Sequence, residues 1–234
     1  MKIALMLHGQ ARHFLHTYEL NKKNIIDKYD VDVFCHLTWD EEIKKNGYVG
    51  RRNIYSVDEN TPDKIIELYK PKKIVITEEF RLGENEQKIL NDFNRFKNIV
   101  NCQNSFFTLL QFKGISEASK LFNWSEYDFI IKMRYDCGFI TLPNLHELDK
   151  NKMYVGRDDW GTCDDRPDCF IDLTYITPNT FQNFVNVYDN LKIDEEFINI
   201  YGTEPVYTYY LHKFGLIDKL VKMDRTQYSL SCPH

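Results

Sequence analysis

The stretch that decides the fold is 127–139, which reads YDFIIKMRYDCGF. Its apolar pair, Ile130 and Ile131, lies inside a segment of five or six residues that is typical of a buried strand. The tripeptide Arg134-Tyr135-Asp136 follows, and a glycine comes soon after it. Ligands of open α/β sheets bind beyond the carboxyl ends of the strands, so Asp136 is expected at a ligand-binding edge. The pattern predicts a site for a charged ligand.

Strands and helices alternate through the first two-thirds of the chain. We expect strands at 3–7, 31–37, 73–77, 129–134, 153–155 and 170–176, and helices at 17–28, 61–69, 106–122, 179–188 and 204–214. The polar segment 40–60 is expected to be a loop, 78–100 an exposed helix or loop, and the end of the chain a polar tail. The β-loop-α-β order of the first forty residues predicts a Rossmann-like α/β opening.

Composition narrows the class of protein. The 234 residues fit one ordinary α/β domain, and a hydrophobic share of 43% is enough to build its core. A net charge of −5 argues against a general nucleic-acid binder. The apolar run after Lys2 is too short for a signal peptide, and no segment approaches a membrane span, so we expect a soluble, cytoplasmic protein. The six cysteines form no C-x-x-C pair and are expected to be reduced thiols; a bridge between Cys163 and Cys169, which flank an acidic loop, is the alternative.

Two short segments carry groups suited to a diphosphate. Gly9, Gln10 and Arg12 lie in the loop after the first strand, where a glycine permits close approach of a ligand and an arginine offers a bidentate grip. Asp136 ends a buried strand, where a carboxylate can bind a divalent ion, and Arg134 stands where a second carboxylate is usual. The alternatives are a solvated arginine in a tight turn and a structural Arg–Asp ion pair.

Two later segments offer a general base. The acidic loop 157–168 contains five carboxylates, among them Asp168, and its Trp160 is suited to stacking on a sugar. Glu204 lies at the start of a predicted helix, where it acts either as a base or as a favourable charge at the helix N-terminus. A solvated or calcium-binding loop is the alternative for the acidic segment, although its spacing does not match an EF-hand. Serine-hydrolase, zinc-protease and protein-kinase motifs do not occur.

Three stretches taken together resemble a known family. They are Leu7-His8-Gly9-Gln10-Ala11-Arg12, then Asp32-Val33-Phe34-x-His36-x-x-Trp39, and then 127–136. The chain resembles small glycosyltransferases of the GT-A fold that occur in large DNA viruses of algae and in bacterial polysaccharide clusters. The similarity is strongest over 1–40 and 105–140 and looser over 150–215.

The resemblance implies an α/β/α sandwich with a mainly parallel central sheet. It implies a single domain over 1–234, with 1–140 binding the nucleotide-sugar and 141–234 on the acceptor side. The enzyme would be a hexosyl- or deoxyhexosyltransferase that uses a nucleotide-diphospho-sugar donor, a glycan or glycoconjugate acceptor, and Mn²⁺ or Mg²⁺.

The resemblance also implies roles for individual residues. Gly9, Gln10 and Arg12 would line the nucleotide pocket. Asp136 matches the last acid of the family's Asp-x-Asp motif and would bind the metal, whereas Arg134 replaces the first acid. Asp168 and Glu204 are the candidates for the catalytic base.

Two other functions compete with this interpretation. A sugar nucleotidyltransferase also binds a nucleotide and a metal on an α/β sheet, but it should show a Gly-rich loop with a lysine near the first strand. A non-catalytic carbohydrate- or nucleotide-binding protein would keep the fold and lose the metal motif, and Arg134 favours it.

Overall fold

The computed structural model describes residues 1–49, 54–78, 83–84, 88, 102–156, 171–177, 181, 209, 211–223 and 229–231. Within these residues, one central sheet has seven strands. They are β1 (Lys2–His8), β2 (Asp30–Thr38), β5 (Lys73–Thr77), β6 (Phe129–Arg134), β8 (Met153–Gly156), β9 (Ile171–Thr177) and β10 (Leu220–Met223).

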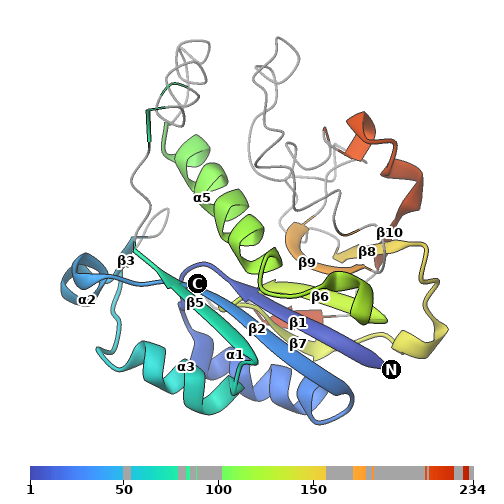
Figure 1. Ribbon diagram of the computed structural model, residues 1–234, viewed down its shortest axis with the longest axis horizontal. Coiled ribbons are helices and arrows are strands. Elements are labelled where there is room, and N and C mark those ends of the chain that lie inside the picture. Colours follow the sequence, from blue (N-terminus) through green and yellow to red (C-terminus); the bar gives the residue numbers. More distant parts are fainter. Residues whose placement is uncertain are drawn as a thin grey trace.

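The strands lie side by side in the order β10-β8-β9-β6-β1-β2-β5 (Figure 1). β5, β2, β1 and β6 run parallel to one another, whereas β9 is antiparallel to both β6 and β8. β10 is parallel to β8. The expected α/β fold with a mainly parallel sheet is therefore confirmed.

The chain reverses its direction across the sheet between β1 and β6. From β1 it proceeds outward through β2 to β5, and it then returns to place β6 on the other side of β1. His8 at the end of β1 pairs in register with Arg134 at the end of β6. Such a switch in strand order opens a crevice beyond the carboxyl ends of the two strands, where ligands of α/β sheets bind.

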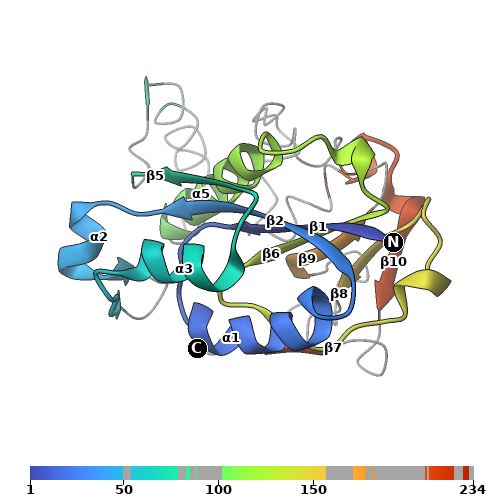
Figure 2. The same ribbon diagram turned by 60° about the horizontal axis from the view of Figure 1, so that its bottom comes forward.

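Helices cover both faces of the sheet (Figure 2). One face carries α1 (Phe14–Asn21), the π-helical turn Lys22–Ile26 that continues it, and α3 (Thr61–Tyr69). The other carries α5 (Cys102–Ser119). Successive side chains of β1 lie on opposite faces of the sheet and so contribute to both hydrophobic cores. Ile3, Leu5 and Leu7 belong to the cluster under α1 and α3, and Ala4 and Met6 belong to the cluster under α5.

Two expectations from the sequence were wrong. Segment 40–60 is not a plain loop: α2 (Glu41–Asn46) begins after Asp40, whose side chain accepts a hydrogen bond from the Ile43 N–H at 2.8 Å. The antiparallel strands β3 (Tyr48–Val49) and β4 (Ile54–Tyr55) follow. The end of the chain is not a plain polar tail either, because β10 joins the central sheet.

The remaining elements are short. β7 (Gly138–Thr141), which the sequence did not predict, pairs with β11 (Ser229–Ser231) beside α1. Single 3₁₀ turns occur at Trp124–Glu126, Leu145–Glu147 and Ile217–Lys219. The acidic loop 157–168, the expected helix at 179–188 apart from Phe181, and most of 78–100 and 204–214 lie outside the described residues. Among the helices that are described, none is long and apolar enough to cross a membrane.

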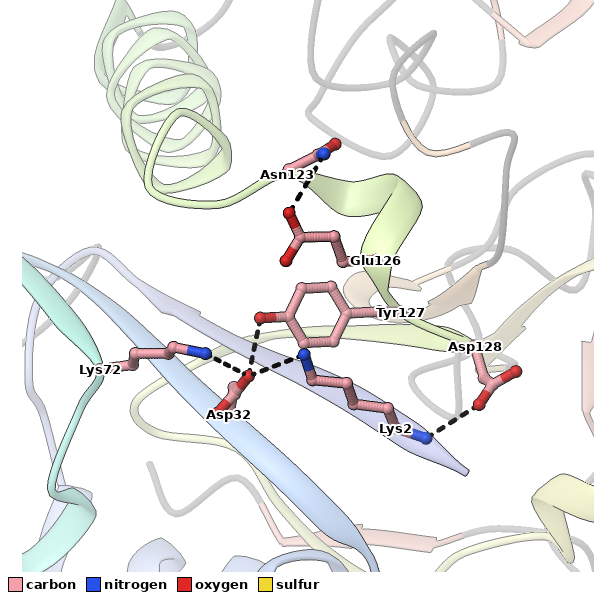
Figure 3. Close-up of polar contacts among 7 residues, drawn as sticks. All are labelled: Lys2, Asp32, Lys72, Asn123, Glu126, Tyr127 and Asp128. Carbon is pink, nitrogen blue, oxygen red and sulfur yellow. Dashed lines mark hydrogen bonds and ion pairs between the residues drawn. The ribbon is translucent and has the colours of Figure 1, made fainter.

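A network of hydrogen bonds and ion pairs joins strands at the amino-terminal edge of the sheet (Figure 3). The Asp32 carboxylate accepts hydrogen bonds from Lys72 Nζ at 2.9 Å and from the Tyr127 hydroxyl at 2.8 Å, and Lys2 Nζ lies 3.5 Å away. Asp128 accepts a hydrogen bond from the backbone N–H of Lys2 at 2.9 Å. These contacts join β1, β2 and the segments that lead into β5 and β6.

Candidate functional site

Two arginines converge on Asp136 at the carboxyl ends of β1 and β6. Arg134 donates two hydrogen bonds to the carboxylate, from Nε to Oδ1 at 2.8 Å and from Nη2 to Oδ2 at 2.6 Å. Nη2 of Arg12 lies 3.0 Å from the same Oδ2. The three side chains therefore form one cluster at the point where the strand order reverses, and they carry a formal net charge of one positive unit.

Asp136 is ionised in this cluster. Burial alone would raise the pKa of its carboxyl, but the charge and hydrogen bonds of Arg134, with the added charge of Arg12, hold that pKa below its usual value. The carboxylate is thus a permanent counter-ion for both guanidinium groups at neutral pH.

The turn that carries Asp136 is held by buried polar side chains of α1 and of the π-helical turn that follows it. Asn21 donates to the carbonyl of Cys137 at 3.1 Å and accepts from the N–H of Phe139 at 3.2 Å. Asn24 donates to the carbonyl of Phe139 at 2.7 Å, and Thr17 donates to the carbonyl of Tyr135. The sequence reasoning missed these residues, although polar side chains at 17, 21 and 24 fall on one face of a predicted helix.

The loop after β1 places Arg12 beside Asp136. Gly9 adopts a φ of +92°, which favours glycine, and nothing lies within 4 Å of the position that a Cβ would occupy. Its N–H donates to the carbonyl of His36 at 3.2 Å, and its carbonyl accepts from the N–H of Thr38 at 3.1 Å, so its backbone is fixed to β2. The Arg12 guanidinium lies over the ring of Tyr55, 5.0 Å from its centroid. Gln10 is half-buried in the same loop.

Two buried histidines lie under α5 at the same edge of the sheet. The ring nitrogens of His8, and Nδ1 of His36, have no hydrogen-bond partner among the described residues, whereas His36 Nε2 is 3.0 Å from the Thr77 hydroxyl. Gly114 of α5 faces both rings, since a Cβ there would lie 3.5 Å from His36 Nδ1 and 3.6 Å from His8 Nδ1.

Both imidazoles are neutral at physiological pH. Burial lowers the pKa of His36 to about 4, although Glu117 raises it in part. Burial, followed by the positive charge of Lys132, lowers the pKa of His8 well below its usual value. Hence these rings add hydrogen-bonding capacity to the edge of the sheet without adding charge.

The structure brings together some of the residues predicted from the sequence. Arg12 and Arg134 each contact Asp136, and Gly9 and Gln10 lie in the loop that leads to Arg12. Asp168 and Glu204, the candidates for the base, lie outside the described residues, as does Trp160. Both cysteines whose pairing is described, Cys35 and Cys137, are free thiols and buried.

The described part of this site does not suit a divalent metal ion. It contains one carboxylate, and both oxygens of that carboxylate are engaged by guanidinium groups. In the part of the chain that the structure describes, no group of three or more His, Cys, Asp or Glu side chains is placed to hold a metal. Mn²⁺ and Mg²⁺ prefer several oxygen ligands, so the predicted metal at Asp136 has no support from its described neighbours.

Comparison with known proteins finds likeness to solved structures only. No family model matches the chain, and no curated protein matches it. Among solved structures, the chain is similar to mouse xyloside xylosyltransferase 1 in its apo form, with 10% sequence identity and a TM-score of 0.43 over 96% of this chain and 85% of that one. A likeness this distant says nothing about activity.

Proposed function

We propose that the protein is a glycosyltransferase that moves a hexosyl or deoxyhexosyl group from a nucleotide-diphospho-sugar to a hydroxyl of a glycan or glycoconjugate. One observation carries the proposal: Arg12 and Arg134 converge where the strand order reverses, at the carboxyl ends of β1 and β6. That crevice is the usual ligand site of open α/β sheets, and a guanidinium fork matches the geometry of phosphate oxygens. The sequence resemblance over 1–40 and 105–140 supports the same class of reaction.

The arginines would act on the leaving group. As the acceptor hydroxyl attacks the anomeric carbon, the bond from that carbon to the diphosphate oxygen breaks, and its electron pair leaves with the diphosphate. Positive charge fixed beside the diphosphate stabilises this developing negative charge. Arg12 and Arg134 are both preorganised for it, because Asp136 holds their guanidinium groups and Tyr55 lies against that of Arg12.

A base must take the proton of the attacking hydroxyl. Asp168 and Glu204 remain the proposed candidates. A carboxylate on the face of the sugar opposite the diphosphate would give inversion at the anomeric carbon. Replacing Asp168 by Asn and Glu204 by Gln, each singly, identifies the base as the variant that keeps donor affinity and loses turnover.

The experiment that tests the function is a panel of donors. The protein is incubated with UDP-, GDP- and dTDP-linked hexoses and deoxyhexoses, with and without a divalent ion, and both the melting temperature and the release of nucleoside diphosphate are measured. We expect one nucleotide class to raise the melting temperature and to be hydrolysed slowly. Arg12→Gln should weaken binding of that donor by about tenfold or more. Lys72→Gln, which removes a positive charge from the opposite edge, should not.

The same panel separates the competing functions. Binding without turnover, even with a broad set of glycan acceptors, would indicate a non-catalytic binding protein on this fold. Release of pyrophosphate from a nucleoside triphosphate and a sugar 1-phosphate would indicate a nucleotidyltransferase. No response to any donor would overturn the transferase proposal.

A further inference from the structure

We infer that Arg12 and Arg134 form a diphosphate-binding site that needs no divalent cation, and that Asp136 is the positioning residue of this site rather than a metal ligand. This inference rests on the proposed function, since it specifies how the diphosphate of the donor is held.

Guanidinium groups already occupy both oxygens of the Asp136 carboxylate. Oδ1 of Asp136 accepts a hydrogen bond from Arg134 at 2.8 Å, and Oδ2 lies 2.6 Å from Arg134 Nη2 and 3.0 Å from Arg12 Nη2. A cation bound to these oxygens would displace both guanidinium groups or lie beside them. Two like charges about 4 Å apart repel by about 4 kcal/mol at the effective dielectric constant of a protein surface. The arrangement therefore favours an anion over a cation.

The two arginine side chains are more exposed to solvent than the carboxylate that they share. The side chain of Asp136 is 6% exposed, whereas those of Arg12 and Arg134 are 19% and 25% exposed. A ligand that enters from solvent meets the guanidinium groups before it meets the carboxylate. Nε of Arg12 is itself buried and has no hydrogen-bond partner among the described residues.

Positive groups also lie beside the ring of His8, at the end of β1. Lys132 and Arg134 both lie close enough to His8 to lower the pKa of that ring, so positive charge extends along β6 toward the end of β1. His8 itself is neutral, and Gly9 beside it leaves open space where other residues carry a Cβ. Among the described residues, this edge therefore combines several positive groups with one buried carboxylate, which is the charge balance of a phosphate site in which arginines take the role of a metal.

Calorimetry tests the inference directly. Inorganic pyrophosphate, UDP and GDP are titrated into the full chain in EDTA and, separately, in Mn²⁺, and binding of Mn²⁺ alone is followed by electron paramagnetic resonance. We expect at least one of these diphosphates to bind with dissociation constants that agree within about threefold in the two buffers. We also expect no stoichiometric Mn²⁺ binding by the protein alone.

Substitutions test whether the diphosphate binds at the cluster of Arg12, Arg134 and Asp136. Arg12→Gln and Arg134→Gln should each raise the dissociation constant in EDTA by about tenfold or more, while Lys72→Gln leaves it unchanged. Asp136→Asn should raise it by a similar factor in EDTA, because the guanidinium groups lose the counter-ion that orients them. An unchanged or lower constant for Asp136→Asn would show that Asp136 does not position the arginines. Melting temperatures of all variants separate these effects from loss of the fold.

The failures of the two proposals are distinct. Diphosphate binding that requires Mn²⁺ and is lost in Asp136→Asn would overturn the inference and leave the glycosyltransferase proposal standing. Metal-independent binding of pyrophosphate without turnover of any donor would support the inference and count against the transferase. Absence of diphosphate binding in both buffers would overturn the inference.

Discussion

Arg12 Nη2 lies 3.0 Å from the carboxylate of Asp136, although one residue follows the first strand and the other follows the fourth strand of the parallel set. This contact joins the loop after β1 to the turn after β6. It also makes a single buried carboxylate the counter-ion of two arginines, which links the stability of the fold to the proposed diphosphate site.

Removal of the Asp136 carboxylate should affect both the stability of the fold and the proposed diphosphate site. In Asp136→Ala, two partly buried guanidinium groups lose their hydrogen-bonded partner, and the free energy of unfolding should fall by about 2 kcal/mol. Donor turnover should be lost while the fold is kept, as judged by urea unfolding and circular dichroism at neutral pH. Asp27→Ala removes an exposed carboxylate paired with Lys22 and should change stability by less than about 1 kcal/mol. Unchanged turnover in Asp136→Ala would show that the residue is only structural.

The buried histidines should make the protein sensitive to mild acid. The pKa of His36 is about 4 in the folded protein, and an unfolded histidine has a pKa of about 6.5. Between these values the unfolded chain binds more protons than the native protein. The free energy of unfolding should therefore fall as the pH falls, by up to about 1.4 kcal/mol per pH unit for each such histidine.

Two measurements check this sensitivity. The imidazole resonances of His36 should titrate near pH 4 in the native protein, below the usual range. The difference in unfolding free energy between about pH 7 and about pH 5 should shrink in His36→Asn. Titration of both rings near pH 6.5 would contradict the expectation.

Gly114 should tolerate alanine and reject a larger side chain. A Cβ at this position would lie 3.5 Å from His36 Nδ1 and 3.6 Å from His8 Nδ1, which are ordinary contact distances. Because alanine favours the helix over glycine, Gly114→Ala should raise the free energy of unfolding by up to about 1 kcal/mol. Gly114→Leu would drive its side chain into the two rings and should lower the melting temperature. A stabilising Gly114→Leu would mean that α5 lies farther from the sheet.

Asn21 should connect α1 to the site. Its amide makes two buried hydrogen bonds to the turn after Asp136, so Asn21→Leu should cost about 3 kcal/mol of unfolding free energy. Donor or pyrophosphate affinity should fall as well, because the turn that carries Asp136 loses its anchor. Asn46→Ala, on the exposed side of α2, serves as the control and should change neither quantity. Normal stability in Asn21→Leu would argue against this role.

Asp32 should affect stability without affecting the site. Its carboxylate joins Lys72, Tyr127 and Lys2 at the amino-terminal edge, and Asp32→Asn should cost about 1 kcal/mol in urea unfolding. Burial raises the pKa of this carboxyl, but Lys72 and Tyr127 outweigh it and the pKa lies below its usual value. The contribution is therefore present above about pH 4 and is lost as the pH falls through the lowered pKa. Pyrophosphate affinity of Asp32→Asn should match the wild type.

Local patterns were sufficient for most of the described elements. The strands β1, β2, β5, β6, β8 and β9 follow from short apolar or alternating runs, α3 follows from the Thr61-Pro62 start of a helix, and α5 follows from helical spacing. β7 and β10 were missed, although β8, which is equally short, was predicted; each of the two missed strands pairs with a partner distant in the sequence, and local patterns do not report that pairing. Segment 40–60 was wrongly predicted to be a loop because most of its residues are polar. Its buried residues Ile43 and Tyr48 are too few to form a periodic pattern, and their burial depends on the rest of the fold.

The sequence alone determined the α/β class, the loop with Gly9 and Arg12, and the strand that ends in Arg134 and Asp136. It did so because propensity and hydrophobic periodicity are local properties. Tertiary structure alone decided that Arg12 reaches Asp136, that Asn21 holds the turn, and that His8 and His36 share a buried edge with Gly114. Each of these contacts depends on the strand order, which sets β6 beside β1 and brings the carboxyl ends of parallel strands to one edge of the sheet.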